Sequence, residues 1–361
     1  MKKLLLLALV MIGGVINVNA ADDLYLRSDF DGTNHWNSDD AALKFTYVGY
    51  KDETNEDVYT YTINASDISA TDIWFRLHIP NWGAQICPYT SSGSYTFDLE
   101  NQRSKTYGAK YEKGYFQGDQ LSFGISHHTI KASQYKITVF RGYSEQYYEG
   151  ENCRVMWIEV EILSVPASIS SLGYSTFSSA YPVDFTDVTD VTAYRAEQTL
   201  DNKVLLKKVT GKVAASTGLV LKGTTTTIPT TDSGTSYNLQ TSDTNYLMAS
   251  VNATTITPQS GTSDFYYFLS GTSSTDVGFY QLENNNTYTS AAGKAYYHTP
   301  TPLDTGNGTR AAWIFEGEET QGINTVESTQ NADIVYDLQG RVAKTTKAGL
   351  YIKNGKKVIM K

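Results

Sequence analysis

Short apolar runs, separated by polar and turn-forming residues, recur along the whole chain. In the run Ile73–Ile79 every second residue is apolar, while Trp74, Arg76 and His78 share the opposite, solvent-facing side of the strand that this alternation predicts. No window sustains the 3.6-residue spacing of an amphipathic helix. Tyrosine, threonine and valine suit a half-buried pleated surface, and 28 glycines supply turns. The pattern predicts an all-β protein.

The spacing of the runs predicts four parts. Residues 1–20 form a signal peptide, 21–165 a β-sandwich, 166–320 a β-rich region of unassigned role, and 321–361 a linker with a small β-meander. The strands expected in the sandwich are 24–26, 44–50, 58–63, 73–79, 95–99, 120–125, 135–140 and 155–163. Those expected in the β-rich region are 191–194, 204–209, 218–221, 246–248, 265–269, 278–282, 294–297 and 313–315.

The N-terminus has the pattern of an export signal. Lys2 and Lys3 precede the apolar run 4–12, and Val18 and Ala20 are small residues at the −3 and −1 positions of a cleavage site. That run is too short to cross a bilayer, and no later stretch approaches about 18 apolar residues. We therefore expect an exported chain without a transmembrane segment, at the cell surface or extracellular.

The last residues contain three short apolar runs, 334–336, 350–352 and 358–360, and Asn354-Gly355 between the last two is a strong hairpin signal. With Asp337–Arg341 and Gly349–Tyr351, this segment resembles the C-terminal sorting domain (type IX secretion-like) of Bacteroidetes secreted proteins. The resemblance implies secretion machinery as a partner and leaves open whether the domain is cleaved or anchored. Residues 218–223 and 293–296 resemble a β domain that often precedes it, which implies a spacer or stalk.

Charge and cysteine content exclude several classes of function. The formal net charge is −9, whereas nucleic-acid binding needs a basic face, so we expect no nucleic-acid partner. Cys87 and Cys153 could form one disulfide in an oxidising compartment or remain two buried thiols. Two cysteines and scattered histidines lack the spacing of a zinc site. The stretch Asp29–Asp40 begins like a calcium loop but has no Glu at its twelfth position, which favours an Asx-rich turn. No metal or cofactor is expected.

Three tryptophans occupy positions that periodicity does not assign to a core. Trp74 lies on the charge-bearing side of its strand, Trp82 in a turn and Trp36 in a loop. An exposed indole can stack on the C–H face of a pyranose while polar side chains meet its hydroxyls. The alternative is that these tryptophans seal loop ends over the core. The residues expected to contact a glycan are Trp36, Trp74 and Trp82 by stacking, and Arg76, Asn81 and Gln85 by polar contacts.

Two segments resemble a known class of module. Residues 24–34 with Trp36 are similar to the opening of starch-binding modules in Bacteroidetes surface glycan-binding lipoproteins, and residues 74–83 resemble their strand and turn. Ser28 and Asp31 depart from that pattern, and no lipobox is present. The resemblance implies a carbohydrate-binding β-sandwich and leaves the glycan open.

Sequence motifs of enzymes are absent: there is no Gly-x-Ser-x-Gly, His-Glu-x-x-His or phosphate-binding loop. Spacing alone does not make an acid/base pair of Glu149, Glu151, Glu159 and Glu161. We therefore predict an exported, non-catalytic glycan-binding protein whose ligand is a polysaccharide or oligosaccharide. The alternative is a structural or adhesive surface protein in which the tryptophans pack, and the third hypothesis is a glycan-active hydrolase with a facing carboxylate pair.

Overall fold

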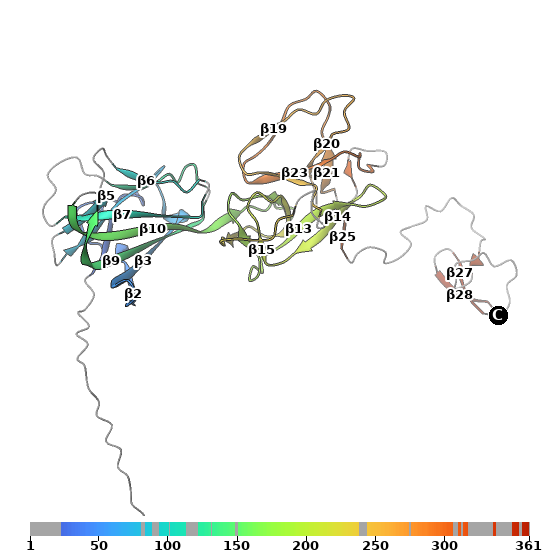
Figure 1. The fold of residues 1–361 in the computed structure, drawn as a ribbon. Coiled ribbons are helices and arrows are strands. Elements are labelled where there is room, and N and C mark those ends of the chain that lie inside the picture. Colours follow the sequence, from blue (N-terminus) through green and yellow to red (C-terminus); the bar gives the residue numbers. More distant parts are fainter. Residues whose placement is uncertain are drawn as a thin grey trace, which may run out of the picture. The chain divides into compact units, whose positions relative to one another are not determined.

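The computed structural model confirms the all-β prediction (Figure 1). Apart from strands, the part of the chain that it describes contains two 3-10 turns, η1 (Ala41–Leu43) and η2 (Ala65–Asp67). No helix among these residues is long and apolar enough to span a membrane. The described residues are 23–80, 84–88, 94–100, 102–112, 122–130, 132–148, 151–237, 244–273, 276–305, 310–311, 313–316, 335–336, 349–353 and 356–360.

The N-terminal strands form one large sheet with the order β2-β3-β9-β10-β7-β5-β4-β8-β6. Two more strands join outside this path, because β1 pairs with β4 and β17 pairs with β10. Among the described strands of this sheet, only β6 and β8 pair in parallel. The bounds are β1 (Tyr25–Ser28), β2 (Thr46–Lys51), β3 (Glu56–Asn64), β4 (Ile73–Ile79), β5 (Ala84–Pro88), β6 (Tyr95–Phe97), β7 (Ser104–Glu112), β8 (Phe123–Ile125), β9 (Gln134–Tyr148), β10 (Glu151–Ala167) and β17 (Thr226–Pro229).

This sheet curls around a single hydrophobic core. Buried apolar side chains of β3, β9 and β10 belong to the same core as those of β4, β6 and β8, so the two parts of the sheet face each other as in a sandwich. Phe75 on β4 stacks on Phe123 of β8 with 5.4 Å between ring centroids. Ile73, Phe75, Leu77 and Ile79 all point into this core, as the alternation predicted.

The described residues of the β-rich region form two five-stranded sheets, ordered β11-β16-β13-β14-β25 and β18-β23-β20-β21-β24, and the two-stranded pairs β12-β15 and β19-β22. A second core of buried residues lies here and includes Leu206, Tyr267 and Tyr297. The bounds are β11 (Tyr174–Phe177), β12 (Val183–Asp184), β13 (Val191–Gln198), β14 (Val204–Val209), β15 (Lys212–Val213), β16 (Leu219–Gly223), β18 (Leu247–Ser250), β19 (Thr254–Ile256), β20 (Phe265–Ser270), β21 (Gly278–Gln281), β22 (Tyr288–Ser290), β23 (Lys294–Thr299), β24 (Arg310–Ala311) and β25 (Trp313–Phe315).

The strand expected to end at Leu163 continues to Ala167, and its extension pairs with β17. Phe177 and Tyr181, from the following region, are buried in the same core as the N-terminal strands. The Tyr181 hydroxyl donates a hydrogen bond to the carbonyl oxygen of Leu99 at 2.7 Å. The described residues up to Glu316 accordingly form one compact unit. The boundary at residue 165 stays a prediction.

The C-terminal strands form a second, separate unit. β26 (Val335–Tyr336), β27 (Gly349–Lys353) and β28 (Lys356–Met360) make a three-stranded antiparallel sheet, in which Tyr351 is opposite Val358. This sheet is the small β-meander that the three apolar runs predicted.

Candidate functional site

The candidate site is the outer face of β4, the side opposite the core. One edge of β4 pairs with β1, which places Arg27 opposite Arg76 and Tyr25 opposite His78. The other edge pairs first with β8 and then with β5. Alternation puts Trp74, Arg76 and His78 together on this face because the intervening residues are committed to the core.

Trp74 lies across a glycine of the neighbouring strand. It is paired with Gly124 of β8, and a Cβ atom added to Gly124 would come within 2.6 Å of the Trp74 ring atom Cζ3. The missing side chain therefore lets the indole lie against the sheet. The Trp74 side chain nevertheless stays 37 % exposed, so part of the ring is open to solvent. The arrangement holds a flat aromatic surface on a rigid strand.

Arg76 is not the solvent-facing side chain that alternation suggested. It is 7 % exposed, because the loop that contains Trp36 folds over it. The centre of the Arg76 guanidinium lies 4.7 Å from the centroid of the Trp36 ring, within the range of a cation–π contact. The Arg76 Nε atom also donates to the Ser122 hydroxyl at 3.2 Å. Trp36 itself is half-buried.

Asp39 connects the loop to both β1 and β4. Its Oδ1 atom accepts from the Arg27 guanidinium at 2.9 Å and lies 2.6 Å from the Nδ1 atom of His78. His78 is buried, contrary to the solvent-facing position that alternation suggested. Burial, together with the charge of Arg27, lowers the pKa of His78 even though Asp39 acts in the opposite direction. This shift favours the uncharged imidazole of His78 at neutral pH.

The loop between β1 and η1 is an Asx-rich turn. Asp31 and Asn34 accept from the backbone N–H groups of Thr33 and Trp36, and Asp40 caps η1. His35 lies between two carboxylates, 3.1 Å from Asp31 and 3.3 Å from Asp40. Among the described residues no group of three or more His, Cys, Asp or Glu side chains is placed to hold a metal ion.

The side chains of the other predicted site residues are not described by the structure. Asn81 and Trp82 lie outside the described residues, and for Gln85 the structure gives its backbone pairing with His78 of β4 and Glu112 of β7 but not its side chain. Cys87 and Cys153 lie in β5 and β10, with β7 between them. Their side chains lie outside the described part, so the choice between a disulfide and two thiols stays open.

Sequence reasoning missed the residues that support the tryptophans. Gly124 has a signal in the sequence, because a glycine between two apolar strand residues often marks a close approach. No sequence signal marks Arg27, Asp39 and Ser122, because they contact residues of β4 that are distant along the chain.

Of the four carboxylates considered for catalysis, one is occupied in ion pairs, two are not described, and Glu159 is half-buried on β10. Glu161 on β10 pairs with Lys136 of β9 at 2.6 Å and with Arg103. The side chains of Glu149 and Glu151 lie outside the described residues. His127 and His128 contact different partners, Tyr135 and Asp72.

No protein-family model matches the chain, and neither the curated proteins nor the solved structures contain a match. The resemblances drawn from its two ends and its tryptophan-bearing strands therefore remain expectations.

Proposed function

We propose that the protein is an exported, non-catalytic glycan-binding protein that binds its ligand on the outer face of β4. The observation that carries the proposal is the Trp74 side chain, a large aromatic that lies flat over Gly124 and keeps 37 % of its surface exposed. Trp36 extends the aromatic surface where it covers Arg76 on the same face of the sheet.

The Trp74 side chain is held rigidly on the sheet. Strand pairing fixes the backbone of Trp74, and the contact with Gly124 restricts its ring, so stacking on a sugar would cost little conformational entropy. The apolar C–H face of a pyranose matches such a ring. Arg76 and His78 lie beneath the loop, so their first role is to hold the tryptophan-bearing loop on the strand.

Export and display rest on the sequence alone. The charged and apolar N-terminus supports secretion, and the Asp337–Arg341 and Gly349–Tyr351 patterns support recognition by a secretion machinery that reads the C-terminus. Residues 166–320 would then act as a spacer between the binding face and the sorting segment.

The alternative is a structural or adhesive surface protein. The contacts of Trp36 with Arg76 and of Trp74 with Gly124 favour it, because both are packing contacts that need no ligand. The glycan-binding hypothesis predicts that removal of the exposed Trp74 indole abolishes glycan retention, whereas the structural hypothesis predicts no retention to lose.

The test is retention of the chain, without its first 20 residues, by a panel of starch, plant and host polysaccharides. Trp74→Ala should abolish retention by the bound glycan while the circular dichroism spectrum stays unchanged. Tyr50→Ala is the matched control, because Tyr50 is also an exposed aromatic (47 %) but lies on the edge strand β2. Equal retention of the two variants would show that the glycan binds away from Trp74, and no retention by any glycan would favour the structural or adhesive protein.

A further inference from the structure

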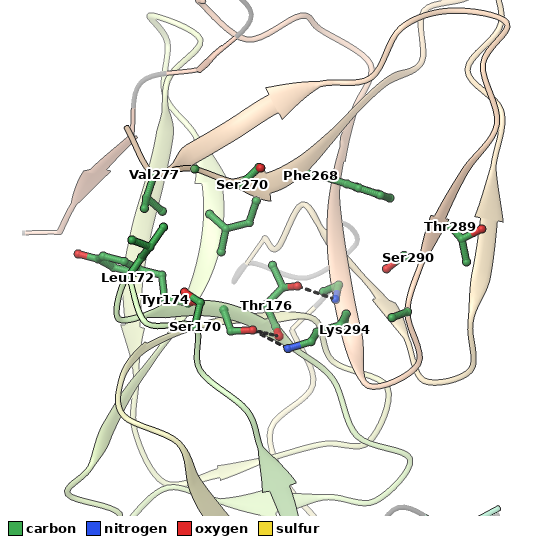
Figure 2. A pocket seen from close by; sticks show the side chains of 15 residues that line it. Ser170, Leu172, Tyr174, Thr176, Phe268, Ser270, Val277, Thr289, Ser290 and Lys294 are labelled. Atoms are coloured by element: carbon green, nitrogen blue, oxygen red, sulfur yellow. Dashed lines mark hydrogen bonds between the residues drawn. The ribbon is translucent and has the colours of Figure 1, made fainter. Parts of the chain in front are cut away.

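A cavity of about 320 Å³ lies in the β-rich region, away from β4. Its wall comes from β11, the ends of β20 and β22, and the start of β23 (Figure 2). The volume falls at the lower end of the range of about 300–1,000 Å³ typical of small-molecule sites. Sequence reasoning gave this region no role beyond a spacer.

Lys294 supplies the cavity with a positive charge. Its ammonium donates to the Ser175 hydroxyl at 2.6 Å and to the Ser168 carbonyl oxygen at 3.2 Å, and Figure 2 shows the amine beside the β11 segment. An ammonium has three donors, so one remains for a ligand. No carboxylate of the described residues lies within 4 Å of this amine to form an ion pair. Burial lowers the pKa of Lys294, as expected for a desolvated cation.

The remaining lining is divided between hydroxyls and apolar groups. Leu172, Phe268 and Val277 form apolar wall, with Phe268 extending along one side in Figure 2. The hydroxyl-bearing residues of the lining are Ser170, Tyr174, Ser175, Thr176, Ser270, Thr289 and Ser290. Such a surface matches a molecule that has hydroxyls on its rim and C–H groups on its face.

Two acidic side chains, Asp276 and Glu100, lie near the cavity, and neither forms an ion pair with Lys294. Asp276, next to the lining residue Val277, accepts hydrogen bonds from the backbone N–H groups of Thr272 and Ser273 and from the Thr272 hydroxyl. These bonds lower the pKa of Asp276 to about 2. Glu100 lines a neighbouring cavity that Lys294 also borders, and it is exposed. Among the described residues, no carboxylate forms an ion pair with Lys294 at the wall of the first cavity.

We infer that this cavity binds a small sugar acid, with its carboxylate on Lys294 and its ring hydroxyls on the surrounding serines and threonines. A carboxylate carries the single charge that one ammonium balances, and a charge-assisted hydrogen bond to it is stronger than one to a neutral group. The apolar wall accepts the C–H face of the sugar ring. The site is independent of the β4 face.

The experiment measures binding of glucuronate and galacturonate to the full chain by ligand-observed NMR and calorimetry. Their methyl esters are the matched control ligands, because they keep the shape of the acid and lose its charge. We expect at least one acid to bind about tenfold more tightly than its ester, the size of effect given by one charge-assisted hydrogen bond. This comparison needs no variant protein.

Two variants then locate the site. Lys294→Met should remove binding of the acid, whereas Lys208→Met, which removes an exposed lysine of β14, should leave it unchanged. Burial favours the neutral amine and lowers the pKa of Lys294 below its ordinary value of about 10.4. The affinity for the acid should therefore fall as the pH rises through this lowered pKa. Equal binding of acid and ester, undiminished binding by Lys294→Met, or no binding of either acid would overturn the inference.

Discussion

Trp74 can lie flat on the sheet because its cross-strand neighbour has no side chain. Gly124→Ala would place a Cβ atom 2.6 Å from the Trp74 Cζ3 atom, so the indole must move away from the strand. We expect a destabilisation of about 1–3 kcal/mol, as for other overpacked positions, and weaker glycan retention. Urea unfolding would measure the destabilisation, and the glycan retention assay would measure the second effect.

The Trp74→Ala background provides the control for that substitution. With the indole removed, Gly124→Ala meets no ring, and its cost should largely disappear in a double-mutant cycle. A cost that is unchanged by Trp74→Ala would mean that the alanine disturbs the strand itself.

At the scale of elements, the loop between β1 and η1 is held to β4 through Asp39, Arg27 and the neutral His78. The folded protein disfavours protonation of His78, so the unfolded chain binds more protons below its ordinary pKa of about 6.5. Stability should therefore be full above that pH and fall as the pH drops through it. Burial also lowers the pKa of His127, which adds to the same trend.

The measurement is the melting temperature between pH 7.5 and pH 5. His78→Gln should flatten the dependence, because its side chain does not titrate, whereas His298→Gln in the β-rich region controls for the loss of a histidine. Identical slopes for the wild type and His78→Gln would show that the loop is not held by a neutral imidazole.

Periodicity predicted most strands because their alternation is strong. It found 73–79 and 204–209 with the bounds of β4 and β14. It missed β5, which is short and ends in Pro88, and β7, whose polar residues and Gly108 show no alternation. Trp74 was correctly placed on the outer face, but the burial of Arg76 and His78 was not predicted. That burial depends on a loop whose position over the strand no local pattern encodes.

At the scale of the molecule, the first two β regions share a core. Phe177 and Tyr181 are buried among N-terminal side chains, and β17 adds to the N-terminal sheet. We therefore expect the unit up to Glu316 to unfold in one transition rather than two. Calorimetry and fluorescence should give coincident transitions, and a second, separate transition would contradict a shared core.

Tyr181→Phe tests this coupling more finely. It removes the hydroxyl that donates to Leu99 and should cost about 1 kcal/mol, the net value of a typical hydrogen bond. If the core is shared, the whole transition shifts. A shift confined to one probe would mean that the two regions respond separately.

The parallel pairing of β14 with β25 joins Val204 to Trp313, residues from early and late parts of the β-rich region. Contacts so distant along the chain form slowly, because the entropy cost of closing the intervening segment must be met before the pairing contributes any stabilisation. During synthesis, β14 therefore waits with one edge unpaired until residues 313–315 arrive. An open edge is a template for association between chains. The β-rich region can thus complete its fold only after nearly the whole unit has been synthesised. Until β25 is available, association between chains is avoided if the nascent chain stays extended or is bound by a chaperone.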